Sequence, residues 1–119
     1  MNSHILIAGL GGFIGTVIRA SVNDLFSLRQ PFWTTMGINI LGSLILGLCI
    51  GYWESNSADA KWKAFLAVGI CGGFSTFSAF SMENVQLLRN GEFITAITYI
   101  GLSVLLGVAA AWFGYKINL

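Results

Sequence analysis

Hydrophobic residues along this chain gather in four long stretches that carry almost no charge. Three of these stretches contain no charged residue and run over residues 32–53, 64–82 and 93–115. The other stretch, residues 5–25, includes Arg19 and Asp24, although its first half is uncharged and small or apolar. A helix of about 20 apolar residues crosses the hydrocarbon core of a bilayer. The pattern therefore predicts an all-α membrane protein with one domain of four transmembrane helices, at about residues 5–26, 32–53, 63–88 and 93–116.

Short connections separate the predicted helices, at residues 27–31, 54–63 and 89–92. Asn90 and Gly91 in the last connection favour a turn. Aromatic side chains that carry a polar atom favour the interface between water and lipid. Residues of this kind lie near the predicted helix ends and support them: Trp33, Trp53, Trp62, Trp112 and Tyr115.

The composition supports a membrane location and argues against nucleic acid as a partner. Hydrophobic residues make up 55% of the chain and charged residues only 9%, against about 25% charged residues in an ordinary soluble domain. Because so few residues are charged, the lipid bilayer is the expected surrounding. The formal net charge of +1 gives no basic surface for nucleic acid. Cys49 and Cys71 lie in apolar stretches and are expected to be packing residues.

The basic residues outside the predicted helices are shared almost evenly between the two sides of the membrane. Lys61, Lys63 and Lys116 lie on the side of both termini, whereas Arg29 and Arg89 lie on the other side. An excess of such residues normally fixes the orientation of a membrane protein. Two interpretations stay open: the chain inserts in both orientations, which permits an antiparallel pair, or one orientation wins on smaller effects.

Polar residues recur at every fourth position of two predicted helices and therefore lie on one face of each helix. The second helix has Thr35, Asn39 and Ser43, followed by Gly47 and Gly51, and the fourth has Thr95, Tyr99 and Ser103, followed by Gly107 and Ala111. The simplest interpretation is close helix packing, which the small-residue pairs at Gly47 and Gly51 and at Gly11 and Gly15 also favour.

The third helix contains a sequence that weakens helical structure near its centre. Gly72 and Gly73 are followed by Ser75 and Thr76, and both residue types offer the backbone alternatives to the helix. An interrupted helix in lipid leaves carbonyl groups that protein, water or an ion must satisfy, and such interruptions are typical of ion sites. We expect the third helix to be broken at mid-membrane, with close packing at a helix crossing as the alternative.

Phe77 and Phe80 follow this sequence and project from one helix face, close to Thr76 and Ser78. The edge of a phenyl ring is positively polarised, and hydroxyl groups donate hydrogen bonds, so the combination can hold an anion without a formal charge. The alternative is an ordinary aromatic pair in contact with lipid.

Arg19 and Glu83 are the charged residues nearest the interior of the predicted helices. A charge inside a membrane is by default a functional residue. The alternative is a side chain that reaches from near the helix end to the interface.

Three segments of the chain resemble the CrcB/Fluc family of fluoride channels. The first is Gly11 to Gly15 followed by Arg19, and the second is Thr35-x-x-x-Asn39-x-x-Gly42. The third and most specific is Gly72-Gly73-Phe74-Ser75-Thr76-Phe77-Ser78-Ala79-Phe80. The resemblance extends over essentially the whole chain.

The resemblance implies an antiparallel, dual-topology homodimer in the inner (plasma) membrane of the cell, with two pores that each contain residues of both subunits. It implies passive export of fluoride with selectivity over chloride, and no enzymatic activity or catalytic residue. The carbonyl groups of Gly72 and Ser75 would bind a structural sodium ion (Na⁺) at the dimer interface, where two carbonyls from each chain suit a hard cation.

By the same resemblance, Phe77 and Phe80 would contact the ion, and the amide of Asn39 would donate a hydrogen bond to it. Further candidates for the ion path are Ser78, Thr76, Ser103, Tyr99, Thr35, Arg19 and Glu83. The chain departs from the family pattern at Ser75, Ala79 and Ala20, and Gly107 has no hydroxyl group where some members have one.

Two other classes of function are weighed against the channel. A small dual-topology multidrug-type transporter would be expected to carry an acidic residue deep in its first helix, but Asp24 lies near the end of that helix. A purely structural membrane subunit would use its glycine stripes for assembly alone, and it predicts no ion flux.

Overall fold

The computed structural model describes residues 3–26, 31–57 and 59–117, which form helices joined by short turns. The elements are α1 (Ser3–Leu25), α2 (Pro31–Ser55), α3 (Ala60–Lys63), the π-helix η1 (Ala64–Cys71), α4 (Gly72–Phe74), α5 (Phe77–Arg89) and α6 (Phe93–Lys116). The described residues contain no strand. Arg29, which entered the comparison of loop charges, lies outside the described residues.

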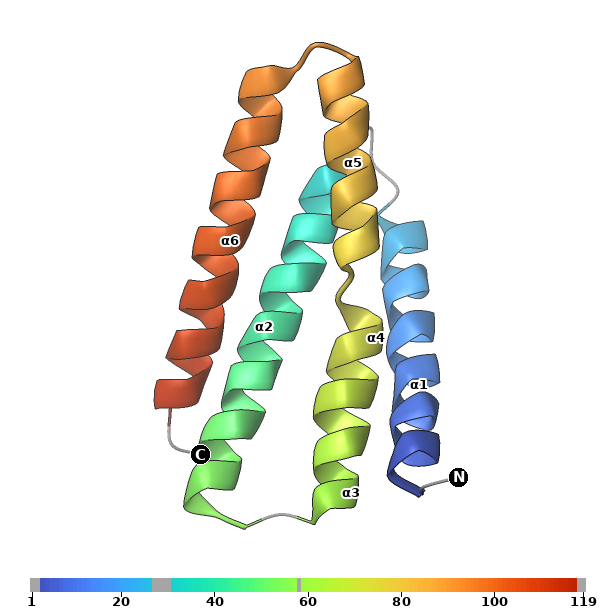
Figure 1. Ribbon diagram of the computed structural model, residues 1–119, viewed down its shortest axis with the longest axis vertical. Coiled ribbons are helices and arrows are strands. Elements are labelled where there is room, and N and C mark those ends of the chain that lie inside the picture. The colour runs from blue at the N-terminus through green and yellow to red at the C-terminus, as the bar shows by residue number, and fades with distance from the viewer. Residues whose placement is uncertain (1–2, 27–30, 58, 118–119) are drawn as a thin grey trace.

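Four stretches of helix are long and apolar enough to cross a membrane: Ser3–Leu25, Phe32–Glu54, Ala60–Arg89 and Phe93–Lys116. This confirms the predicted all-helical protein with four candidate spans. The start of α1, the turn between α2 and α3, and the end of α6 lie at one end of the molecule, opposite the turn between α5 and α6 (Figure 1). Gly91 in that last turn has a φ of 76°, which explains why a glycine follows Asn90 there.

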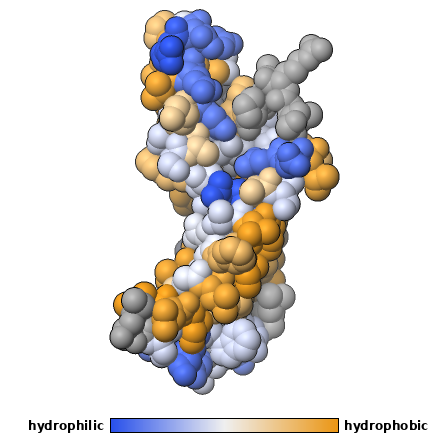
Figure 2. All heavy atoms as spheres, turned by 90° about the vertical axis from the view of Figure 1, so that its right-hand side faces the viewer, coloured by the Kyte–Doolittle hydropathy of each residue, from blue (hydrophilic) through white to orange (hydrophobic). Residues whose placement is uncertain are grey.

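Large hydrophobic side chains on the outside of the helices remain exposed, as expected for a surface that faces lipid. Phe13, Ile94 and Val108 are 68%, 78% and 66% exposed. Figure 2 shows hydrophobic side chains gathered across the lower part of one face, with hydrophilic groups at both ends and at mid-height. A water-soluble chain would bury such residues.

The helices pack in two close pairs, α1 against η1 and α4, and α2 against α6 (Figure 1). Glycines make both contacts possible. A Cβ atom at Gly15 would collide with the carbonyl of Ile70, and one at Gly47 with the carbonyl of Ala111. The predicted small-residue packing is confirmed in both helices, since Gly11 and Gly51 make equivalent backbone contacts.

A small buried core lies where α2, α5 and α6 meet. Its buried residues are Met36, Leu87, Ala96 and Tyr99, and Phe80 packs against them. This core fixes the position of α5 relative to α2, and the candidate site lies beside it.

The stretch Ala60–Arg89 is not one continuous helix. Ser75 (φ −86°, ψ 156°) and Thr76 (φ −147°, ψ 124°) are extended and separate α4 from α5. Gly72 and Gly73 themselves are helical, so the extended residues lie just after the glycine pair rather than in it. At the other end the stretch begins at Ala60, earlier than expected, because the carboxylate of Asp59 caps the helix by accepting a hydrogen bond from the Lys61 amide at 2.9 Å.

Candidate functional site

Asn39 of α2 and Thr76 of the interruption are joined by two hydrogen bonds. Asn39 Nδ2 donates to the Thr76 carbonyl at 3.1 Å, and the Thr76 amide donates to Asn39 Oδ1 at 2.8 Å. The side-chain amide thus replaces the backbone partners that Thr76 would have in a helix. This pairing explains why the chain is extended at Thr76, and it leaves one Nδ2 hydrogen of Asn39 for another acceptor.

Thr76 also starts the next helix. Its hydroxyl Oγ1 accepts a hydrogen bond from the Ala79 amide at 3.2 Å, which makes it the N-cap of α5. Its hydroxyl lies 3.2 Å from the hydroxyl of Ser78. Two predicted ion-path residues therefore form one hydroxyl pair at the N-terminus of α5, where free backbone amides favour negative charge.

Because of these hydrogen bonds, the carbonyls of Gly72 and Ser75 lose the backbone amides that would donate to them in a helix. In a continuous helix the Thr76 amide would donate to the Gly72 carbonyl and the Ala79 amide to the Ser75 carbonyl. Here these amides donate to Asn39 Oδ1 and Thr76 Oγ1 instead. Uncharged carbonyl oxygens are ligands that suit a hard cation, so the two residues predicted to bind sodium fit that role chemically.

Arg19 of α1 lies at the end of α4, where its Nε donates to the Gly73 carbonyl at 3.1 Å. A cation favours the C-terminal end of a helix because the helix dipole is negative there. The side chain is half-buried, so it does not simply extend to the interface. No hydrogen bond joins it to Glu83, the other predicted intramembrane charge, among the bonds between described residues.

A groove of about 250 Å³ opens at the interruption and is lined by Asn39, Ser43, Ser75, Thr76 and Phe77. None of these five side chains is charged, and four carry a hydrogen-bonding group. The groove can therefore offer neutral donors to a small ion on one side. Ser43 is a lining residue that the sequence did not single out, although it belongs to the polar stripe of the second predicted helix.

The two phenylalanines of the site differ in their surroundings. Phe80 packs against the buried Tyr99, with ring centroids 5.0 Å apart and planes at 62°. Phe77 borders the groove and is 78% exposed, with its ring centroid 5.7 Å from that of Phe80. The structure brings the two rings together but covers only one of them.

The half-buried Glu83 accepts hydrogen bonds from two hydroxyl groups. Thr35 Oγ1 donates to Glu83 Oε2 and the Tyr99 hydroxyl to Oε1, each at 2.7 Å. Thr35 and Tyr99 are only 3% and 1% exposed. Three predicted ion-path residues thus form one cluster, which joins α2, α5 and α6, and the ring of Phe80 packs against its Tyr99.

Ser103 of α6 lies one turn beyond Tyr99. Its Oγ is buried and has no hydrogen-bond partner in the part of the chain that the structure describes. One further turn along, Gly107 lies beside α2, since Ser43 Oγ would be 3.7 Å from a Cβ atom placed there.

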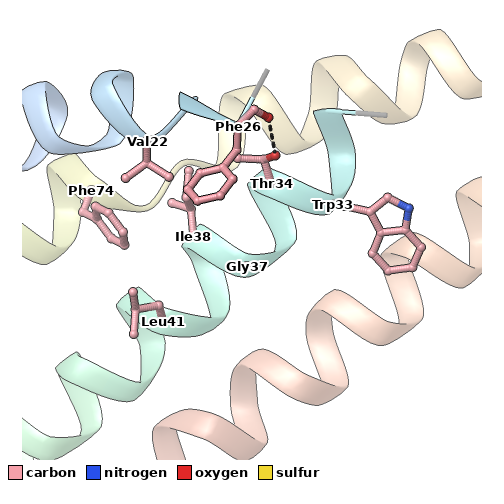
Figure 3. A pocket seen from close by; sticks show the side chains of 8 residues that line it. All are labelled: Val22, Phe26, Trp33, Thr34, Gly37, Ile38, Leu41 and Phe74. Atoms are coloured by element: carbon pink, nitrogen blue, oxygen red, sulfur yellow. Dashed lines mark hydrogen bonds between the residues drawn. The ribbon is translucent and has the colours of Figure 1, made fainter. Parts of the chain in front are cut away.

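A second groove, of about 460 Å³, lies where α1 and α2 meet near Phe74 (Figure 3). Its lining is mostly apolar: the side chains with a polar atom are Trp33 and Thr34, and the Thr34 hydroxyl donates to the Phe26 carbonyl at 3.2 Å. A groove of this kind offers few groups that replace the hydration of an ion. Of these two grooves, the one beside Thr76 is therefore the better candidate for a charged ligand.

Comparison with known proteins gives a family match over nearly the whole chain. The model described as CrcB-like protein, Camphor Resistance (CrcB), matches residues 6–115. The fluoride-specific ion channel FluC of Flavobacterium psychrophilum is 43% identical over 115 residues, which cover 92% of each chain. Proteins of the same name from Hyphomonas neptunium and Campylobacter jejuni are 44% and 36% identical, covering 96% and 98% of this chain and 93% and 98% of the relatives. Because these matches include all four candidate spans, the chain is a multi-pass membrane protein that belongs to the CrcB family.

Proposed function

We propose that this chain forms a channel that passes fluoride passively across the inner (plasma) membrane and excludes chloride. The observation that carries the proposal is the uncharged polar groove at the interruption between α4 and α5. The names of the relatives, which are fluoride-specific ion channels, support the choice of ion. Each 100 mV of inside-negative potential favours outward movement of one negative charge by about 2.3 kcal/mol, so flow through the channel lowers cytoplasmic fluoride.

Selectivity follows from the size of the ion and the placement of the donors. A small anion holds its water tightly and enters a pore only where fixed donors replace that water. Asn39 and the hydroxyls of Thr76 and Ser78 supply such donors, and the edges of Phe77 and Phe80 add positive polarisation. A larger halide would not fit donors spaced for fluoride.

The single chain covers only one side of this path. The groove is open to the outside, and Phe77 is 78% exposed at its edge. We propose that a second, antiparallel copy of the chain covers this side and that each pore contains residues of both copies. The nearly balanced basic residues on the two sides support insertion in both orientations.

The interruption also suits the proposed sodium site at the dimer interface. Ser75 and Thr76 lie close to the middle of the stretch Ala60–Arg89, which would place them near the bilayer midplane. Gly72 is exposed on the single chain, so its carbonyl region is accessible to a second copy. A bound sodium ion would neutralise the partial negative charge of the carbonyls of Gly72 and Ser75.

The rival transporter has less support. Asp24, the acidic residue that it would require deep in the first span, is exposed near the end of α1. Glu83 is inside the protein, but both of its oxygens already accept hydrogen bonds.

Halide efflux from liposomes that hold the purified protein tests the proposed function. Fluoride should leave quickly and chloride should be retained, and Phe80→Ile should slow fluoride because it removes the aromatic edge. Trp112→Phe, at an exposed position near the end of α6, is the control and should conduct as the wild type does. Equal flux of both halides, or none of either, would exclude the channel.

Sodium dependence tests the metal site separately. The dimer should resist dissociation by detergent better in sodium than in a large organic cation such as N-methylglucamine, because binding to the assembled state stabilises it. Stability that does not depend on the cation would remove sodium from the proposal and leave the channel in place.

A further inference from the structure

Ser43 of α2 lies one helical turn beyond Asn39 on the same face, and both residues line the groove at the interruption. Gly42 brings the α2 backbone against this region, since a Cβ atom there would lie 3.2 Å from Ser75 Cβ. Ser43 is half-buried, and it continues the line of polar groups away from Thr76.

Across from Ser43 stands Gly107 of α6, a residue without a side chain. A Cβ atom built on Gly107 would have Ser43 Oγ at 3.7 Å as its only neighbour within 4 Å among the described residues outside the α6 backbone. The Ser43 hydroxyl therefore lies beside the space that a hydroxyl-bearing side chain at position 107 would fill. One turn further on, Gly47 contacts the backbone of Ala111, so the two helices close there.

The Ser43 hydroxyl is also free to donate. Ser21 and Ser75 donate to the carbonyl four residues earlier, at 2.8 and 2.7 Å, as helical serines commonly do. Ser43 has no such bond to any residue in the described ranges 3–26, 31–57 and 59–117. Its proton can therefore point toward an anion without breaking a bond within the protein.

We infer that Ser43 donates a hydrogen bond to the permeating anion, in place of the hydroxyl that α6 lacks at Gly107. The inference rests on the proposed fluoride channel and adds to it a residue from α2. The polar path then runs from Thr76 and Asn39 to Ser43, with hydroxyls from two helices rather than from α6 alone.

The test compares fluoride efflux from liposomes for variants that differ by a hydroxyl group. Ser43→Ala should slow fluoride efflux about tenfold, since a hydrogen bond to a charged group is lost. Ser43→Thr should stay close to the wild type, whereas Ser43→Val, which has the same shape without the hydroxyl, should be as slow as Ser43→Ala. This pair keeps the test valid even if the smaller side chain disturbs packing.

Rescue from the opposite helix separates donation from packing. Gly107→Ser has room for its side chain, so the double variant with Ser43→Ala and Gly107→Ser should regain most of the flux. The double variant with Ser43→Ala and Gly107→Ala fills the same space without a donor and should remain slow. Equal rescue by both would show that Ser43 acts by packing, and it would overturn the inference.

Two results distinguish the failure of this inference from failure of the proposed function. If the wild type is fluoride-selective and Ser43→Val conducts as well as Ser43→Thr, Ser43 is not a donor and the channel stands. If the wild type carries no selective fluoride flux, the channel fails and the role of Ser43 fails with it.

Discussion

The side chain of Asn39 holds the backbone of Thr76, which is 37 positions away in the sequence, in an extended conformation. Its side-chain amide pairs with both the backbone amide and the carbonyl of Thr76, as the backbone of a neighbouring β-strand would. Without this partner, two backbone groups of Thr76 would be left in a low-dielectric environment, where unpaired polar groups are costly.

Asn39→Ala should therefore destabilise the protein and stop fluoride flux. Loss of the two hydrogen bonds should lower the free energy of unfolding by about 1–3 kcal/mol, measured by tryptophan fluorescence during titration with a denaturing detergent. Asn39→Asp keeps the acceptor for the Thr76 amide, but it cannot donate to the Thr76 carbonyl and it adds a negative charge. Its fluoride flux should therefore be lost as in Asn39→Ala, while its free energy of unfolding should fall by less than in Asn39→Ala. Asn56→Ala, which removes an exposed bond to Tyr52, is the control and should change stability by less than about 0.5 kcal/mol.

The Glu83 cluster predicts a coupled pair of substitutions. Thr35→Val and Tyr99→Phe each remove one donor to an oxygen of the half-buried Glu83 carboxylate, beside the buried core. Each should lower the free energy of unfolding by about 1–3 kcal/mol. Because the two donors share one acceptor group, the double variant should depart from the sum of the single effects. Additive effects would indicate that the carboxylate is solvated in the protein.

Residue types at the site could be predicted from the sequence, but their partners could not. The every-fourth spacing placed Thr35, Asn39 and Ser43 on one face of a helix. It could not show that Thr35 meets Glu83, which is 48 positions away, because that contact depends on how α2 and α5 pack. For the same reason the sequence does not distinguish Ser43 from a serine that only packs, because its place in the groove and beside Gly107 depends on the fold.

At the scale of the elements, the contact between α2 and α6 depends on the absence of a side chain at Gly47. The small-residue spacing predicted this close approach because glycine pairs at that spacing have few other uses in a membrane helix. The interruption in the third span was harder to place. Glycines weaken a helix without ending it, and the extended residues are those that α2 and the cap of α5 hold in that state.

Gly47→Ala should separate α2 from α6, since the new Cβ atom would overlap the backbone of Ala111. Overpacking of this kind should lower the free energy of unfolding by about 1–3 kcal/mol, measured by the same detergent titration. Gly37→Ala in the same helix is the matched control, because no described residue outside the α2 backbone has an atom within 4 Å of a Cβ atom there. Similar losses at both positions would point to a general effect of helix glycines instead.

For the whole molecule, the described helices form a bundle with one well-packed pair on each side and an uncovered polar groove between them. A stable membrane protein does not expose such a groove to lipid, because its polar groups would lose their water without replacement. The four-helix architecture was predictable from hydropathy alone. The balanced basic residues and the family resemblance led to the proposed second copy, and the folded chain adds an open groove for that copy to cover.

Insertion in both orientations can be measured with one cysteine. Asn90→Cys, with Cys49 and Cys71 replaced by alanine, places a thiol in the exposed turn between α5 and α6. An impermeant maleimide applied to intact spheroplasts should label about half of the protein, because the basic residues favour neither side. Labelling of nearly all molecules, or of almost none, would show a single orientation and contradict the antiparallel dimer.

The ties of Thr76 to Asn39 and of Gly73 to Arg19 anchor the two ends of the interruption to different helices. Neither half of the third span can then swivel without breaking contacts to α1 or α2. In the proposed channel an arriving ion would meet donors that are already in place, so little rearrangement of the protein would be needed for it to bind or leave. The rate of passage would then depend on how fast the ion loses and regains its water rather than on a conformational change of the protein.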